Sequence, residues 1–281
     1  GVFDVQVYSL NALLKRSATY ASASITALGK TAPPSNVANF TNSIDPSIGV
    51  LLTWDNISDL DLSSYEIRVG STSSTWADAT FVTRVTATSY KLGLIEQSTK
   101  KYHIKAIDTS NIYSTTAATT TVTITAPSTP SPAFTNEDVT AILSWSASTG
   151  SYAIAYYDVL FSGTSIAQVK TTSFNIPITW TGLRAYTVKA VDIAGNQSTA
   201  GTANITVLQA AAPTVAATFS GENIALSWNA VDGTTKTRAY QVIVDTVVVA
   251  TIQSTAYSFK ATGVGTKSIG IKAVDANGNL G

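Results

Sequence analysis

The sequence predicts an all-β protein built as a tandem array of small β-sandwiches. Apolar residues recur at every second position, as in Tyr240-Gln-Val-Ile-Val244, rather than with the 3.6-residue period of a helical face. Val, Ile, Thr and Tyr, which favour strands, dominate these segments. Short sequence phrases also repeat in a fixed order along the 281 residues. Several short strands per repeat, separated by turn signals, are typical of a sandwich.

Three phrases mark each repeat. The first is an apolar run that ends in Trp, at Trp54, Trp145 and Trp228. The second is a Tyr followed by alternating apolar residues, at Tyr65, Tyr157 and Tyr240. The third is a strand end of the form Lys-Ala-(Ile/Val)-Asp, at Asp108, Asp192 and Asp275. Successive Trp residues are 91 and 83 positions apart, and successive Asp residues 84 and 83. Because independent markers share one period, the chain contains repeated modules.

The phrases divide the chain into four parts. Residues 1–29 read as the end of one module, because Phe3-Asp-Val-Gln-Val7 resembles the third phrase alone. Residues 33–126 and 127–209 each hold a whole module, and residues 211–281 hold a module that lacks its last strand. The seams contain proline, which stiffens such connections. These partial modules, and the absence of Met, predict a segment of a longer polypeptide.

Turn signals and aromatic residues place the elements inside each module. Ser162-Gly163 and Asp245-Thr246 are expected to form two-residue hairpin turns, and Ala194-Gly-Asn196 and Asn277-Gly278 later loops. The recurring Trp and Tyr residues are expected to supply much of the core, because aromatic side chains bury the most apolar area. The predicted structural core is Trp54, Tyr65, Trp145, Tyr157, Trp228 and Tyr240.

Composition excludes several functional classes. Seventeen basic and 17 acidic residues give a net charge of +0, which offers no basic footprint for nucleic acid. The absence of Cys excludes disulfide frameworks, zinc fingers and thiol catalysis. No apolar run approaches the roughly 18 residues that cross a bilayer, so no membrane insertion by this segment is expected. Charged residues make up only 12%, which predicts a surface rich in Ser and Thr.

The order of these phrases resembles that of fibronectin type III domains over essentially the whole chain. A Trp on the second strand, a Tyr opening the third and Tyr-x-Val-Lys-Ala-Val-Asp192 late in the module carry the resemblance. The family usually places a Tyr eight residues before the Asn or Asp that ends the sixth strand. Lys100, Arg184 and Lys267 occupy those positions here. The usual tyrosine corner is therefore expected to be absent.

A narrower resemblance covers roughly the first 110 residues and the module ends. The junction from Asn11-Ala-Leu-Leu-Lys-Arg-Ser17 to Leu28-Gly-Lys-Thr-Ala-Pro-Pro-Ser35 is similar to junctions in the host-specificity, J-type tail-tip proteins of long-tailed phages. So are the run from Asp59 to Gly70, the following Thr75-Trp-Ala-Asp-Ala79, and the endings Lys-Ala-Val-Asp-x-x-Gly-Asn. Similar modules occur in secreted bacterial glycoside hydrolases and adhesins.

The sequence offers little that could carry chemistry. His103 is the only histidine, and alternation places it opposite Tyr102 and Ile104, on a strand face expected to be exposed. Gly29-Lys30-Thr31 ends like a phosphate-binding loop, but Pro33 and Pro34 follow where a helix should start, so a linker is expected. No catalytic, cofactor-binding or metal site is predicted, and the chain is not expected to be an enzyme.

Two further features leave alternatives open. Asp55, Asp59 and Asp61 cluster in one loop, but without the Gly and closing Glu of an EF-hand they favour a solvated acidic loop over a calcium site. Trp76, in an insertion that only one module has, and Trp180 do not recur between modules. Each either packs locally or contacts a ligand or neighbour.

Two classes of function follow. The first is a structural and adhesion segment of a phage tail-tip or central tail fibre protein, located in the virion. The phage resemblance implies a homotrimer in contact with other tail-tip and baseplate proteins, supporting recognition of a bacterial surface receptor, protein or glycan. The alternative is an extracellular or cell-surface location, as spacer or carbohydrate-binding modules of a secreted bacterial polysaccharide-degrading enzyme, or as part of a surface adhesin. Flanking sequence would separate the two.

Overall fold

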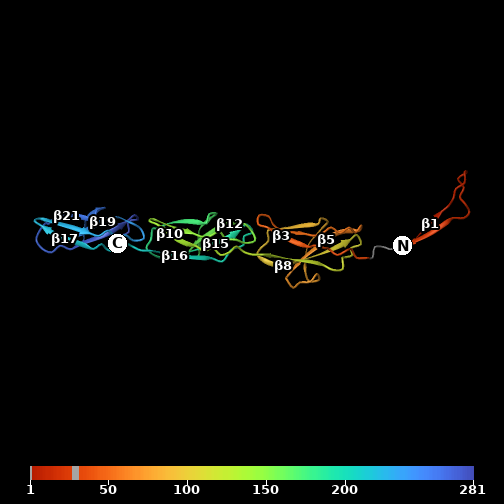
Figure 1. The fold of residues 1–281 in the computed structure, drawn as a ribbon, viewed down its shortest axis with the longest axis horizontal. Helices are drawn as coiled ribbons and strands as arrows, with labels where there is room; N and C mark the ends of the chain where they lie inside the picture. Colours follow the sequence, from red (N-terminus) through yellow and green to blue (C-terminus); the bar gives the residue numbers. More distant parts are fainter. Residues whose placement is uncertain (1, 27–31) are drawn as a thin grey trace. The chain divides into compact units, whose positions relative to one another are not determined.

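The computed structural model describes residues 2–26 and 32–281, and every regular element in that part of the chain is a β-strand (Figure 1). The all-β prediction is therefore confirmed. Among the described residues no helix is long and apolar enough to cross a membrane. The Gly29-Lys30-Thr31 motif lies outside the described residues. By their internal contacts, the residues form two compact units, Gly1–Ile124 and Thr125–Gly281.

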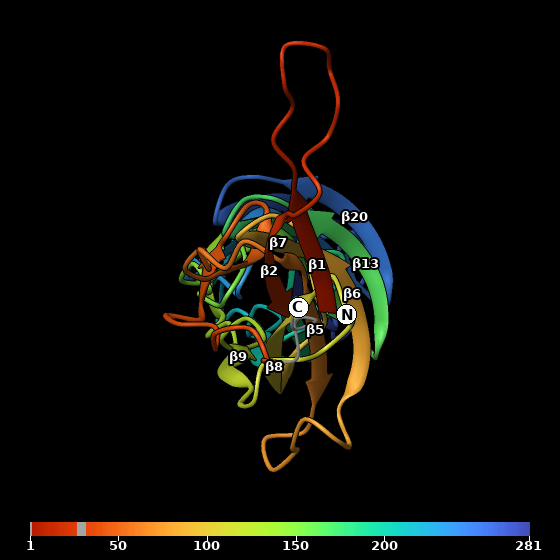
Figure 2. The same cartoon turned by 90° about the vertical axis from the view of Figure 1, so that its right-hand side faces the viewer.

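The first strands form a two-stranded antiparallel hairpin, β1 (Val2–Val7) with β2 (Ala21–Thr26). Figure 2 shows the long loop that joins them. The side chains of Val5, Val7, Leu13 and Leu14 are exposed. A lone hairpin is marginally stable because it has no second layer to bury its apolar face.

Module 1 is a sandwich of a three-stranded and a four-stranded antiparallel sheet. The sheets have the strand orders β3-β4-β7 and β6-β5-β8-β9. Their strands are β3 (Thr41–Asp45), β4 (Gly49–Thr53), β5 (Leu62–Gly70), β6 (Thr80–Val85), β7 (Ser89–Gly93), β8 (Ser98–Asp108) and β9 (Ala118–Ile124).

Module 2 repeats this order in the second unit, with sheets β10-β11-β14 and β13-β12-β15-β16. Its strands are β10 (Ala133–Glu137), β11 (Thr140–Ser144), β12 (Ile154–Phe161), β13 (Thr164–Val169), β14 (Ser173–Pro177), β15 (Gly182–Asp192) and β16 (Gly201–Val207).

Module 3 has two three-stranded sheets, β17-β18-β21 and β20-β19-β22. Its strands are β17 (Val215–Ser220), β18 (Asn223–Trp228), β19 (Thr237–Val244), β20 (Val247–Ile252), β21 (Ala256–Lys260) and β22 (Ile269–Asp275). On β22 the neighbour that β9 and β16 provide in the other modules is missing.

The six aromatic residues expected in the core are all buried. In each module the recurring Trp packs edge-on against the recurring Tyr, with ring centroids 5.4, 5.3 and 5.6 Å apart in modules 1 to 3. Such edge-to-face pairs stabilise beyond the area they bury. This pair joins the two sheets, because the Trp follows or ends the second strand of one sheet and the Tyr lies on the second sheet.

The recurring Tyr also carries a hydrogen bond that the sequence did not reveal. The hydroxyl of Tyr65 accepts the backbone N–H of Ile57 at 3.0 Å. Tyr157 accepts from Ser148 at 2.8 Å, and Tyr240 from Val231 at 3.3 Å. A Tyr on the third strand thus satisfies a backbone donor in the preceding loop, whereas Lys100, Arg184 and Lys267 occupy the tyrosine-corner positions of the sixth strand.

The recurring Asp at the end of the sixth strand holds the turn that follows. Oδ1 of Asp192 accepts the backbone N–H groups of Ala194 and Asn196, both at 2.9 Å. Asp108 and Asp275 accept the equivalent pairs in their modules. Aspartate commonly fixes turns in this way, which explains why the third phrase always ends in Asp.

The two predicted hairpin turns are confirmed. Ser162-Gly163 joins β12 to β13 with φ angles of 50° and 79°, and Asp245-Thr246 joins β19 to β20 with 51° and 72°. Two successive positive φ angles match the right-handed twist of the flanking strands. Thr246 adopts this conformation although β-branched residues disfavour it.

Candidate functional site

The clearest departure from the repeat is the loop 71–79 that joins β5 to β6 in module 1 (Figure 2). Asp78 fixes its middle by accepting the backbone N–H and the hydroxyl of Thr75, both at 2.6 Å. Gly70 lets the loop return closely to the strand, since a Cβ there would lie 2.3 Å from Ser74 Oγ. The loop therefore covers part of the outer face of the sheet.

His103 lies beneath this loop, so the predicted exposure was wrong. Alternation does place it opposite Tyr102 and Ile104, but Ser74 closes over that face and leaves His103 only 2% exposed. Its Nε2 lies 2.9 Å from Ser74 Oγ. Burial lowers the pKa of His103, the positive charge of Lys101 lowers it further, and Asp78 partly opposes both.

This Ser–His contact has the wrong polarity for nucleophilic catalysis. The Ser74 hydroxyl donates to the carbonyl of Ser71 at 2.8 Å, so its oxygen accepts from the Nε2–H of His103. A general base must instead accept the proton of the nucleophile. Ser74 is only 6% exposed, which also keeps the pair from a substrate. The contact holds the loop on the sheet.

A second cluster beside the loop is built around Glu66, whose side chain is almost fully buried. Its Oε1 accepts from Arg68 Nε at 2.7 Å, and its Oε2 accepts from Arg84 Nε at 2.8 Å and from the Tyr113 hydroxyl at 2.7 Å. β5 places Glu66 and Arg68 on the face opposite the core residues Tyr65 and Ile67. The sequence did contain a signal for this ion pair, because alternation in Tyr65-Glu-Ile-Arg-Val69 places two opposite charges on one face of the strand.

Burial and these contacts set the directions of the pKa shifts of Glu66 and Tyr113. Burial by itself raises the pKa of Glu66, but hydrogen bonds from Tyr113, Arg68 and Arg84 outweigh it and leave the pKa lowered. Burial and the bond to Glu66 raise the pKa of Tyr113. Glu66 is thus an anion with both oxygens occupied. Shifted pKa values often mark active sites, but a carboxylate committed to three donors serves as an anchor.

Trp76 lies over this cluster and is partly exposed. The guanidinium of Arg68 lies 4.2 Å from the centre of its ring and also donates to its carbonyl at 3.1 Å. The Tyr113 ring packs against it at 5.9 Å. Trp76 therefore packs on its own module, which is the first of the two alternatives given for it, and it keeps a partly exposed surface.

Trp180 is a core residue, only 8% exposed and part of the buried cluster of module 2. Arg184 stacks on its ring at 4.2 Å, and Tyr186 lies at 6.4 Å. Local packing is therefore the observed alternative for Trp180.

The acidic loop is held by hydrogen bonds. Asp59 accepts the backbone N–H of Ser35 at 2.6 Å, and Asp55 accepts the amide of Asn39 at 2.7 Å. Within residues 2–26 and 32–281, no group of three or more His, Cys, Asp or Glu side chains is arranged to hold a metal ion. These carboxylates join the start of module 1 to the loop before β5.

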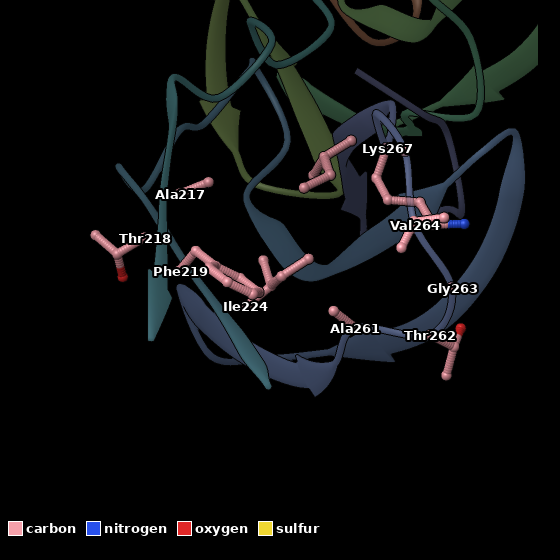
Figure 3. Close-up of a pocket in the computed structure, with 11 residues that line it drawn as sticks. Ala217, Thr218, Phe219, Ile224, Ala261, Thr262, Gly263, Val264 and Lys267 are labelled. Carbon is pink, nitrogen blue, oxygen red and sulfur yellow. The ribbon is translucent and has the colours of Figure 1, made fainter. Parts of the chain in front are cut away.

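A hollow of about 430 Å³ opens beside β22 in module 3 (Figure 3). Its walls include Phe219, Ile224, Val264 and Ile269. In modules 1 and 2 the strands β9 and β16 pair with the strand equivalent to β22 and bury their apolar side chains. The hollow therefore lies at the position that the seventh strand occupies in modules 1 and 2, and we do not assign it as a ligand site.

No family model matches the chain. Exoglucanase B of Cellulomonas fimi is 33% identical over 230 residues, which cover 71% of this chain and 20% of that enzyme. The chain thus spans about a fifth of the length of the relative it matches. The FN1–FN3 domains of chicken CNTN1 match over 88% of this chain and 94% of theirs, with 17% identity and a TM-score of 0.26.

The order of the strands identifies the fold of each module. Modules 1 and 2 share one order, a three-stranded sheet facing a four-stranded sheet, and module 3 shares it except for the last strand. Modules 1 to 3 form a tandem array of fibronectin-type-III-like sandwiches.

Proposed function

We propose that this segment serves as spacer modules of an extracellular, polysaccharide-degrading enzyme whose catalytic domain lies outside residues 1–281. The alignment to Exoglucanase B carries the proposal, because 33% identity extends over 230 residues, several modules long, while covering only 20% of that enzyme. Such an alignment is expected for accessory modules that accompany a larger catalytic part.

The chemistry of the modules supports a role without catalysis. The carboxylate of Glu66 is committed to three donors, and the only histidine donates to a serine. A strand of eight or nine residues spans about 25–30 Å at 3.3 Å per residue, so sandwiches in series give reach. A spacer of this kind would hold a catalytic domain at a distance from another binding part of the same enzyme.

The test uses the polypeptide in which these residues occur. The intact protein should release sugar from glucan. A variant that lacks residues 33–281 should keep its turnover of a short soluble oligosaccharide and lose activity on the insoluble polymer. A loss of both activities would place the modules in catalysis. A protein with no activity on any glucan would overturn the proposal.

The hypothesis of a phage tail protein depends on short phrases at the first junction, between Asp59 and Ala79, and at the module ends. The longer alignment to Exoglucanase B favours the enzyme hypothesis over it. The two differ in assembly, because the resemblance to tail-tip proteins implies a homotrimer. Light scattering on the intact polypeptide separates them. A mass three times that of one chain would favour the phage tail protein, and a monomer would favour the enzyme.

A further inference from the structure

The turn between β10 and β11 in module 2 makes direct contact with module 3. Asp138, at the tip of this turn, accepts the backbone N–H of Lys236 at 2.6 Å through Oδ1 and forms an ion pair with Arg238 through Oδ2. The Asp138 side chain is only 21% exposed. Because Lys236 directly precedes β19 and Arg238 lies within it, one carboxylate holds the start of that strand.

Two asparagine side chains add contacts elsewhere on the same junction. The amide of Asn136 donates to the carbonyl of Thr234 at 2.8 Å. The amide of Asn277, in the turn after β22, donates to the carbonyl of Ile178, which follows β14. Two segments of module 2 are thus bound to two segments of module 3. Anchors at separate points restrict both twisting and bending of module 3 relative to module 2.

The linker between these modules is also tied down. The backbone N–H of Leu208 donates to Thr234 Oγ1 at 2.8 Å, and the N–H of Thr234 donates back to the Leu208 carbonyl at 2.9 Å. Gly233 allows this close approach, since a Cβ there would lie 2.4 Å from the Leu208 oxygen. A free flexible linker would make no such bonds.

We propose that modules 2 and 3 move as one rigid body, with Asp138, Asn136 and Asn277 as the lock between them. Interfaces between neighbouring domains commonly allow relative motion, so a lock of this kind is a specific feature of the junction. It fixes the direction in which module 3 continues from module 2.

The absence of Cys makes the test straightforward, because two introduced cysteines are the only labelling sites. Spin labels at the exposed positions Gln168 on β13 and Thr251 on β20, in the full chain, report the distance between the modules by pulsed electron paramagnetic resonance. The unaltered junction should give one narrow distance distribution. The triple variant Asp138→Asn, Asn136→Ala, Asn277→Ala should lose the narrow peak. Asn tolerates the positive φ of 56° at position 138.

A matched control is available within module 3. Asp245 also has a positive φ, accepts a backbone N–H, from Ser268 at 3.0 Å, and pairs with a cation, Lys267 at 2.8 Å. Asp245→Asn should leave the narrow peak in place. A broad distribution before any junction change, or a triple variant that keeps the narrow peak, would overturn the proposal. Circular dichroism shows whether both sandwiches remain folded, and Asp138→Asn alone replaces the triple variant if they do not.

Discussion

Replacing Tyr65 with Phe removes one oxygen atom and leaves the buried N–H of Ile57 without its acceptor at 3.0 Å. An unsatisfied buried donor destabilises by about 1–3 kcal/mol. The ring stays, so its packing against Trp54 is preserved. For a domain of 60–100 residues, each kcal/mol lowers Tm by about 4–8 °C. Tyr65→Phe is therefore expected to lower the melting temperature of module 1 by at least about 4 °C.

The three modules provide an internal series for this prediction. Tyr157→Phe breaks a bond of 2.8 Å and should act like Tyr65→Phe. Tyr240→Phe breaks a longer, partly buried bond of 3.3 Å, so its effect should stay below about 1 kcal/mol. Tyr257 forms no hydroxyl hydrogen bond in the described structure, and Tyr257→Phe should fall within about 0.5 kcal/mol of the parent.

Calorimetry of the full chain measures these shifts, and hydrogen exchange at the amide of Ile57 reports the broken bond directly. The exchange rate at Ile57 should rise in Tyr65→Phe beyond what the global loss of stability explains. If Tyr65→Phe left the transition of module 1 unchanged, or if Tyr240→Phe destabilised as strongly as the other two, the hydrogen-bond reasoning would be refuted.

Four other predictions concern modules 1 and 2. The folded pKa of His103 is lowered from 6.5, so the stability that His103 contributes is present above pH 6.5 and is lost as the pH falls through the folded pKa. His103→Gln should therefore flatten that part of a plot of Tm against pH. An unchanged slope would contradict the prediction. Glu66, with a pKa lowered from 4.5, should add a second loss below pH 4.5 that Glu66→Gln removes. Trp76→Ala should destabilise module 1 in urea unfolding by about 1 kcal/mol through its lost cation–π contact, and Trp76→Phe by less. Gly201→Ala should destabilise module 2 by about 1–3 kcal/mol, because its Cβ would lie 1.9 Å from the Pro130 carbonyl oxygen. An unchanged unfolding midpoint would show that the backbone at Pro130 moves aside without cost.

The fold could be predicted because its signals are local and repeated. Alternation identifies strands, and the recurring Trp54 and Tyr65 positions mark where the two sheets meet. The two hairpin turns were also readable from Ser162-Gly163 and Asp245-Thr246. These features depend on residues close together in the chain, so the sequence alone specifies them.

The burial of His103 and most of the missed contacts depend on residues that lie far apart in the sequence. His103 was placed on the correct face, but the loop that covers it begins 32 residues earlier, so its burial did not follow from alternation. Two of the three partners of Glu66, Arg84 and Tyr113, come from β6 and from the segment after β8. The bonds of Asp138 join residues 98 and 100 positions apart. A single sequence does not reveal such pairs.

The edge of β22 that lacks a neighbouring strand has a practical consequence for work with this chain. The walls of the hollow beside it include the exposed side chains of Phe219 and Val264. Open edges with apolar surroundings act as templates for strands of other molecules and are a common origin of aggregation. Concentrated preparations of residues 1–281 should accordingly self-associate through this edge. A Lys directed outward from β22 would be the natural safeguard against such growth.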